Sequence, residues 1–432
     1  MTVPNEHRRL LPGALLPLAV GAAPRAWSAA SVPASTPAPA AAPERAGAAL
    51  APWRPGWLDI HHIATGRGNA TFVMLPDGTS MLIDAGASLN ALDVSMAPRP
   101  DASRRAGEWI GRYAGRHLAR AGLEGLDYLL VTHLHPDHTG DVDAASPLAP
   151  GGAYRLSGVT DVAAQVAIGA VVDRGYPGYD FPLRIAAPFA DNYRAFIAAR
   201  RNSGQHVEAF QVGSNDQFAG RGHRRTSVPF EVRNIAASGE VWTGEAAATR
   251  RLVPPLASMA RADWPNENHC SAAIRIASGR FSYFTAGDLT SYTQDCALPW
   301  LNVLGPAAHA AGPVSVATAD HHGMFDGLDA DVVRTLRPRA WIIPSWHIAH
   351  PDMLQLERMF SERLYPGPRA VFATTVMPEN LLANGRLTRR MHSHDGHAVV
   401  RVPPGGERFY VAVTGNADEN DTVRLMGDPF DA

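Results

Sequence analysis

The sequence predicts an α/β sandwich, in which β-sheets and helices lie in layers. Short apolar runs typical of strands form hairpins near both ends of the chain, and strand-like and helix-like segments alternate between them. Hydrophobic residues make up 46% of the chain and charged residues 19%, a composition typical of a protein with a large buried core rather than of a disordered one.

Charge and cysteine content exclude two classes of protein. The chain of 432 residues has 39 basic residues, all arginine, against 41 acidic ones, and a net charge of −2 excludes a protein that binds polyanions by bulk charge alone. Cys270 and Cys296 are too few for a disulfide framework or a cysteine-rich metal site, and the sequence leaves open whether they pair with each other. Histidine, with 18 residues, is the residue type whose spacing carries functional information.

The N-terminal region has the composition of a targeting segment followed by a tether. Arg8 and Arg9 precede an apolar run over residues 10–23, which is shorter than the roughly 20 residues that a membrane span requires, and small residues follow it. Residues 1–30 are therefore predicted to be a signal peptide, for ordinary or twin-arginine export, and residues 31–52 an Ala/Pro-rich linker. We expect the mature protein to be periplasmic or secreted and to have no transmembrane segment.

Residues 53–432 are predicted to form one domain. Apolar residues at 58–63 alternate weakly, and two further runs are joined by a Pro-Asp-Gly turn, which predicts a β-hairpin that ends at Asp84. Helical spacing of apolar residues predicts helices at residues 106–122 and 330–336. Further strands are predicted at residues 128–131, 271–276, 281–285, 314–317, 340–343, 397–402 and 408–413.

Two parts of this domain lack an assigned place in the predicted core. Residues 147–250 show no clean periodicity and are predicted to be an insertion, and residues 366–432 are predicted to be a C-terminal β extension. Three histidines in the extension, His392, His394 and His397, have no carboxylates in a ligand pattern around them, so we interpret them as turn residues before a strand.

The strongest functional pattern is His133-Leu134-His135-Pro136-Asp137-His138, directly after a predicted strand. At the end of a strand, residues two apart point the same way, so His133 and His135 can converge on one ion. Asp137 and His138 follow where the backbone turns and can face the same pocket from its other side. Four such ligands within six residues are costly to hold together without a cation, and the cluster therefore predicts a metal site.

This cluster resembles the HxHxDH motif of the metallo-β-lactamase superfamily, and the resemblance implies an αββα sandwich with a large insertion and a C-terminal β extension. Leu82-Ile83-Asp84-Ala85-Gly86 is similar to the superfamily's first motif, which implies that Asp84 supports the loop of residues 133–138, called the metal loop below. Residues 283–288 resemble the strand whose aspartate, here Asp288, bridges two metals, and Asp320-His321-His322-Gly323 resembles the final histidine motif.

Smaller motifs indicate a branch of the superfamily. Gly68-Asn69-Ala70, Glu267-Asn268 with Ser271, and His350-Pro351 resemble the metallo-hydrolase domain of bacterial DNA-uptake channel proteins and a secreted phosphorylcholine esterase. The resemblance covers about residues 57–365, with gaps.

The resemblance implies metal ligands and catalytic residues. The implied ligands are His133, His135, Asp137, His138, Asp288 and His322. A further histidine ligand is often supplied by a loop: His269 is weakly favoured here over His206 and His223, and water is the other alternative. Of the adjacent His321 and His322, one is expected to bind metal and the other to contact substrate, with His322 favoured as ligand. Asp137, His321 and His350 are the candidate catalytic residues, and His350 is expected at the rim of the site, where it protonates the leaving group or binds an oxyanion.

The expected function is hydrolysis. Two divalent ions, Zn²⁺ first and Mn²⁺ or Fe as alternatives, would generate a metal-bound hydroxide that attacks a phosphodiester or related ester. A lactonase or β-lactam hydrolase of the same fold, and a non-catalytic metal-binding surface protein, are the alternatives. The expected partner is a small-molecule or phosphodiester substrate. Nucleic acid is implied only by the resemblance and is not supported by charge, apart from a small patch of Arg221, Arg224 and Arg225, and the sequence leaves the oligomeric state open.

Overall fold

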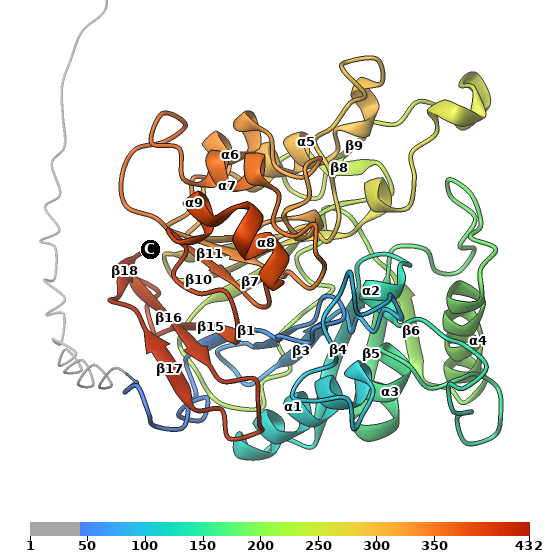
Figure 1. The fold of residues 1–432 in the computed structure, drawn as a ribbon. Helices are drawn as coiled ribbons and strands as arrows, with labels where there is room; N and C mark the ends of the chain where they lie inside the picture. The colour runs from blue at the N-terminus through green and yellow to red at the C-terminus, as the bar shows by residue number, and fades with distance from the viewer. Residues whose placement is uncertain (1–43) are drawn as a thin grey trace, which may run out of the picture. The chain divides into compact units, whose positions relative to one another are not determined.

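The computed structural model describes residues 44–432 (Figure 1). The predicted signal peptide and residues 31–43 of the predicted linker lie outside the described residues. The last part of that linker packs on the domain: Leu50 is buried, and its backbone N–H donates to the carbonyl of Asp421 at 2.9 Å.

The first sheet has ten strands and combines both ends of the described chain. Its order is β17-β16-β15-β1-β2-β3-β4-β5-β6, with β18 paired to β16. The pairs from β17 to β3 are antiparallel, and those from β3 to β6 are parallel. The strands are β1 (Leu58–His62), β2 (Thr71–Met74), β3 (Ser80–Ile83), β4 (Gly125–Val131), β5 (Ala167–Asp173), β6 (His206–Ala209), β15 (His397–Val402), β16 (Arg408–Thr414), β17 (Val423–Met426) and β18 (Phe430–Asp431).

The second sheet has eight strands in the order β14-β13-β12-β11-β10-β7-β8-β9. The strands from β11 to β14 run parallel, and β10 joins them to the antiparallel strands. The strands are β7 (Phe230–Ala237), β8 (Glu240–Trp242), β9 (Thr249–Arg251), β10 (Ala273–Ser278), β11 (Phe281–Thr285), β12 (Val316–Thr318), β13 (Ala340–Ile343) and β14 (Ala370–Ala373).

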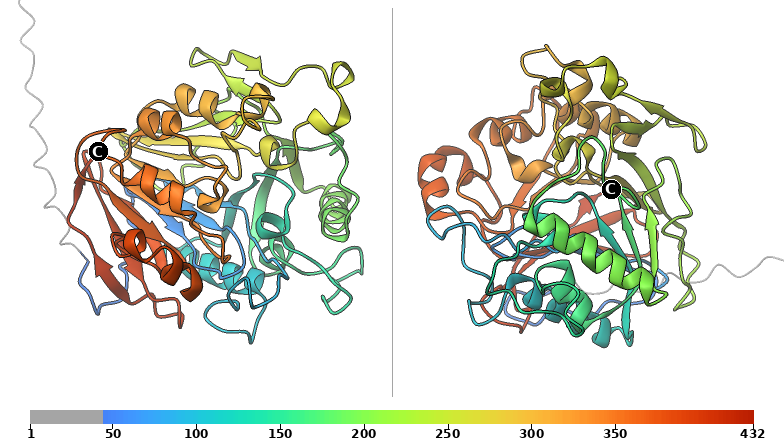
Figure 2. Two further views of the ribbon diagram at one scale, coloured as in Figure 1. Left: turned by 45° about the horizontal axis from the view of Figure 1, so that its top comes forward. Right: turned by 90° about the vertical axis from the view of Figure 1, so that its right-hand side faces the viewer.

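Helices cover the outer faces of both sheets, as the views in Figures 1 and 2 show. Alternating side chains explain the layering: Tyr283 belongs to the core between the sheets, and its neighbour Phe284 belongs to the core beneath the helices of the second sheet. The αββα sandwich predicted from the sequence is thus confirmed. Helices α1 (Ala106–Arg120), α3 (Val159–Gln165) and α4 (Pro188–Asn202) lie on the side of the first sheet, and α5 (Leu304–Ala311), α6 (Ala330–Leu336), α7 (Met353–Met359), α8 (Pro378–Ala383) and α9 (Gly385–Thr388) on that of the second.

Residues 147–250 and 366–432 contribute more to the two sheets than an insertion and an extension would. Strands β5 and β6 continue the first sheet beyond β4, and β7 pairs with β10 in the second. In the C-terminal segment, β15 pairs along the whole of β1, and β14 forms the edge of the second sheet. These strands are separated by long Gly- and Pro-containing loops, and for that reason the sequence shows no regular spacing there.

The parallel pairs determine where functional side chains collect. Strand β3 runs parallel to β4, and β11 runs parallel to β12. The carboxyl ends of parallel neighbours lie at the same edge of their sheet, so the loops after β3 and β4, and those after β11 and β12, lie side by side in pairs. Asp84, the 133–138 cluster, Asp288 and the His321-His322 pair all lie on these four loops.

Candidate metal centre

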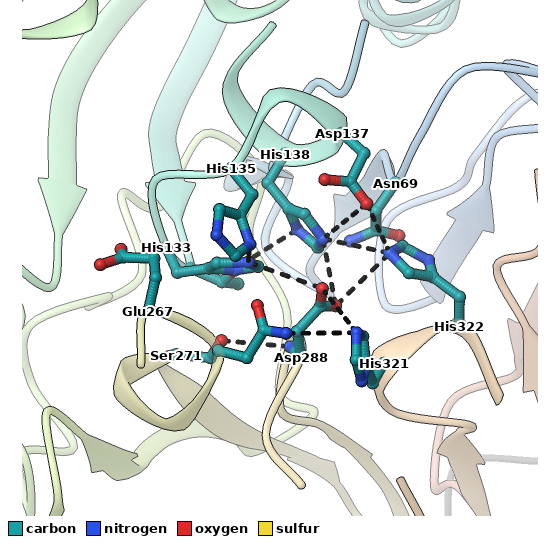
Figure 3. A network of polar contacts seen from close by, with 12 residues as sticks. Asn69, His133, His135, Asp137, His138, Glu267, Ser271, Asp288, His321 and His322 are labelled. Carbon is teal, nitrogen blue, oxygen red and sulfur yellow. Dashed lines mark hydrogen bonds and ion pairs between the residues drawn. The ribbon is translucent and has the colours of Figure 1, made fainter. Parts of the chain in front are cut away.

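The four loops bring their histidine and aspartate side chains together in one buried cluster, shown in Figure 3. His133 and His138 have no solvent exposure, and Asp288 and His322 are each 2% exposed. His135 and Asp137 are partly exposed. The cluster is therefore open to solvent on the side of His135 and Asp137.

The first ligand group consists of Asp137, His138, Asp288 and His322, whose donor atoms lie within 4.8 Å of one another. His138 Nε2 lies 3.1 Å from Asp288 Oδ1. His322 Nε2 lies 3.0 Å from Asp137 Oδ2 and 3.2 Å from His138 Nε2. Two imidazoles and two carboxylates thus face a common point.

The second ligand group consists of His133, His135 and Asp288. His133 Nε2 lies 3.1 Å from His135 Nδ1 and 3.5 Å from Asp288 Oδ2. Asp288 belongs to both groups: Oδ1 faces the first and Oδ2 the second. One carboxylate shared by two ligand groups is the arrangement that a binuclear metal site requires.

The hydrogen bonds around the first group show that its residues fit a cation. His138 Nδ1 lies 2.7 Å from Asp84 Oδ2, and His322 Nδ1 lies 2.9 Å from the carbonyl oxygen of Pro344. Because both partners only accept hydrogen bonds, each Nδ1 carries the proton, and in the neutral rings the two Nε2 atoms face each other with lone pairs. Asp288 Oδ1 is also buried and accepts no hydrogen bond from the described residues. A divalent ion with nitrogen and oxygen ligands satisfies all of these atoms.

The electrostatics of the cluster also call for positive charge. Burial opposes a charged ring, but the carboxylates of Asp288, Asp84 and Asp137 outweigh it and raise the pKa of His138 well above its usual range. Burial likewise opposes a charged carboxylate, but His138, His322 and His133 hold the pKa of Asp288 well below its usual range. Positive charge is therefore favoured between these carboxylates, and either a proton or a metal ion can supply it.

Asp84 supports the metal loop from behind, where the sequence places it. It accepts hydrogen bonds from the backbone N–H of Thr132 at 2.7 Å, from the Thr132 hydroxyl at 2.8 Å and from Asn69 Nδ2 at 3.1 Å, in addition to its contact with His138. Its backbone has a φ of 60°, in the left-handed region that non-glycine residues rarely adopt. This conformation turns the carboxylate under the loop, away from the ligand groups.

The comparison with known families supports the same interpretation. The model of the metallo-beta-lactamase superfamily matches residues 64–150, which contain Asp84 and the whole 133–138 cluster. The match to this superfamily is confined to these residues, which are less than half of the chain. No curated protein matches the chain.

Similar solved structures are distant. A mutant of the CmlA beta-hydroxylase is 13% identical, with a TM-score of 0.38 over 81% of this chain and 54% of its own, so this chain spans about half of its length. The short form of human tRNase Z is 11% identical, with a TM-score of 0.28 over 66% of this chain and 91% of its own. A diphosphatase of the PhnP family is 9% identical, with a TM-score of 0.27 over 66% of this chain and 85% of its own.

His321 and His322 diverge, as expected of adjacent residues. His322 belongs to the first ligand group, and His321 belongs to neither group. His321 Nδ1 lies 2.7 Å from Asp326 Oδ1, and its Nε2 lies 3.2 Å from Asn268 Nδ2 and 3.9 Å from Asp288 Oδ2. Burial alone would lower the pKa of His321, but the carboxylates of Asp288 and Asp326 outweigh it and raise the pKa to about 9. His321 therefore borders the site without joining the ligand groups.

The structure places two predicted site residues differently from the sequence analysis. His269 joins neither ligand group; its Nδ1 accepts a hydrogen bond from the backbone N–H of Asn266 at 3.2 Å, and burial lowers its pKa to about 4. His350 is expected at the rim but is only 4% exposed, with its ring stacked on His322 at 4.9 Å and 15°. Burial, reinforced by His322, lowers the pKa of His350 well below its usual range and so disfavours the charged form of the ring.

The remaining candidate histidines and the two cysteines lie outside both ligand groups. His223 pairs with Asp127 and His206 with Glu208, and neither lies in a ligand group. Cys270 is buried, Cys296 is exposed, and both are free.

Sequence reasoning missed one supporting ion pair. Arg174 follows β5, and its guanidinium pairs with Glu267 in a buried contact. Glu267 Oε1 in turn accepts a hydrogen bond from the backbone N–H of Leu134 at 2.7 Å, between His133 and His135. The sequence signal for this pair is a charged residue directly after a strand, together with Glu267 in the Glu267-Asn268 motif.

Two glycines allow the hairpin loops to pack against the metal loop. A Cβ atom on Gly86 would lie 1.9 Å from the carbonyl oxygen of Asp137, and one on Gly68 would lie 2.3 Å from the same atom. Both distances are too short for any side chain, so these positions require glycine.

We therefore expect Gly86→Ala to lower the free energy of unfolding by about 1–3 kcal/mol, because the metal loop must shift to admit the methyl group. Metal retention should fall with it. Denaturant titration and metal analysis measure both effects, and Gly115→Ala is the matched control, since its Cβ would meet only Val166 at 3.5 Å. Wild-type stability and metal content in the Gly86 variant would contradict this close approach.

Proposed function

We propose that the protein is an exported, binuclear metal-dependent hydrolase of phosphodiesters or related esters. The observation that carries the proposal is Asp288, whose two oxygens face two separate groups of ligands. Two ions bound there would supply an activated water nucleophile and would neutralise charge on a phosphate.

The side chains of the chain have distinct roles in this proposal. His133, His135 and Asp288 would hold one ion, and Asp137, His138, His322 and Asp288 the other. His321 is 16% exposed in its side chain and lies beside the ligand groups, so it is placed to contact a substrate oxygen. Asp326 fixes the orientation of its ring through Nδ1, which leaves Nε2 directed towards the site.

Nucleic acid gains little support as the substrate. Arg224 donates to the carbonyl of Ala121 at 2.9 Å, and Arg221 lies over the ring of Tyr128 at 4.6 Å. Two of the three arginines of the small basic patch are thus engaged within the protein. A phosphoester of a small molecule or polymer is the substrate class that the proposal names.

Export is part of the proposal and depends on the N-terminal sequence alone. Arg8 and Arg9 precede the short apolar run, and small residues follow. Within residues 44–432, no helix is long and apolar enough to cross a membrane.

The proposal predicts close to two transition-metal ions per chain. Elemental analysis after gentle purification with metal supplied measures this number, and a screen of phosphodiester, thioester, lactone and β-lactam substrates identifies the reaction. One ion or none would refute the binuclear site. Two ions with turnover of lactones or β-lactams alone, or with no turnover, would instead favour the alternative hydrolases or a metal-binding surface protein.

A further inference from the structure

We propose that a cavity next to the metal loop is an anion subsite, built around Arg67, that binds a second phosphate or carboxylate group of the substrate. This inference rests on the proposed function, because it concerns the substrate of the same site. It adds a substrate class: esters with a second negative group a short distance from the bond that is hydrolysed.

Arg67 is a buried arginine without a carboxylate partner. It is 9% exposed, and only its Nη1 is used within the protein: it donates to Ser95 Oγ at 2.9 Å and to the carbonyl oxygens of Ser88 at 3.4 Å and of Asn90. No ion pair joins Arg67 to an acidic residue in the described part of the chain, and its Nε and Nη2 have no partner there but are not sealed from solvent. A buried cation that lacks a counter-charge is costly, and a bound anion would compensate it.

Arg67 lines a cavity of about 350 Å³. Serine hydroxyls and a second arginine, Arg104, also line it, and these are the groups that recognise phosphate and carboxylate oxygens. The lining serines are Ser88, Ser103, Ser146 and Ser157.

Three arginines and two carboxylates line the cavity, namely Arg67, Arg104, Arg105, Glu108 and Asp141. Of these, Arg105 pairs with Glu108 at 3.3 Å and with Asp161 at 2.6 Å. Arg104 contacts only the ring face of Trp109, at 5.5 Å. Neither Arg67 nor Arg104 forms an ion pair with a described residue, and neither does Asp141.

The cavity wall and the metal loop share backbone contacts. Ala87, which lines the cavity, donates its N–H to the carbonyl of Pro136 at 3.1 Å and accepts from Asp141 N–H at 3.0 Å. Asn69, which lies two residues after Arg67 in the sequence, donates its N–H to the carbonyl of Asp137 at 2.8 Å. Backbone hydrogen bonds thus join the cavity wall to the loop that carries Asp137.

The first test uses two para-nitrophenyl phosphodiesters that differ only at the far end of the alcohol, a carboxypropyl ester and its methyl ester. The wild-type protein should prefer the carboxylate by about tenfold in kcat/KM, mainly through KM, since charge-assisted hydrogen bonds are worth that much. Arg67→Gln and Arg104→Gln should each reduce this ratio. Arg280→Gln, in a separate arginine-lined cavity, should leave the ratio unchanged.

The second test does not depend on turnover, so it separates this inference from the proposed function. Sulfate, compared with chloride at equal ionic strength, should raise the melting temperature of the metal-loaded wild type and of Arg280→Gln more than that of Arg67→Gln or Arg104→Gln. If neither ester is hydrolysed but this difference appears, the subsite stands and the proposed reaction fails. An equal sulfate effect in all variants, or an unchanged carboxylate preference in both the Arg67 and Arg104 variants, would overturn the subsite.

Discussion

Asp288→Ala is expected to abolish hydrolysis, with a loss on the order of a thousandfold or more, because the Lewis acidity of a metal pair contributes several kcal/mol and each 1.4 kcal/mol is about tenfold in rate. Asp288 is the only residue that belongs to both ligand groups of the described chain. Its removal takes one ligand from each group and leaves His133 and His138 without the carboxylate that each faces.

Asp84→Ala provides the matched comparison. Asp84 touches His138 Nδ1 and the backbone of Thr132 but lies in neither ligand group, so its loss should cost only about 10–100-fold in activity or metal affinity. Turnover and metal content at saturating metal measure both variants, and Asp331→Ala, at an exposed carboxylate, is the control for lost charge. Equal or reversed effects of the Asp288 and Asp84 variants would show that the two aspartates have been assigned the wrong roles.

The parts of the fold that the sequence predicts well have local signals. The hairpin before Asp84 carries its own Pro-Asp-Gly turn, and helix α6 and strands β13 and β15 begin and end at their predicted residues. The strands β5 to β9 were not predicted, because the loops between them obscure the periodicity and because their partners lie far away in the sequence. Strand β5, for example, includes Gly169 and is recognisable only by its pairing with β4.

The candidate site also has a part that local sequence predicts and a part that depends on the tertiary fold. His133, His135, Asp137 and His138 are contiguous, so the backbone geometry of a strand end is enough to bring them together. Asp288 and His322 needed the resemblance, because 150 or more residues separate them from the metal loop and only the sheet order brings the loops together. The burial of His350, the isolation of His269 and the pairing of Arg174 with Glu267 depend on packing between distant segments, and no local pattern encodes them.

His350 illustrates how packing changes the role of a residue. The sequence places a histidine near the site but does not indicate which way its ring faces. In the structure its ring lies flat against His322, with Trp346 at 5.6 Å on its edge. The His322 ring is also held by a second contact, between its Nδ1 and the carbonyl oxygen of Pro344. We infer from this stacked contact that His350 is a positioning residue, which fixes the plane of the His322 ring.

His350→Ala should lower turnover by about 10–100-fold and weaken metal retention along with it, since the loss of a residue that orients a ligand has effects of this size. His350→Phe, which keeps a flat ring against His322, should restore most of the metal content and a large part of the turnover. If His350 instead donated a proton or bound an oxyanion, both variants would keep their full metal content and would lose turnover equally. Metal analysis and steady-state kinetics of the two variants separate these roles, because a phenyl ring can stack on His322 but cannot donate or accept the proton of an imidazole.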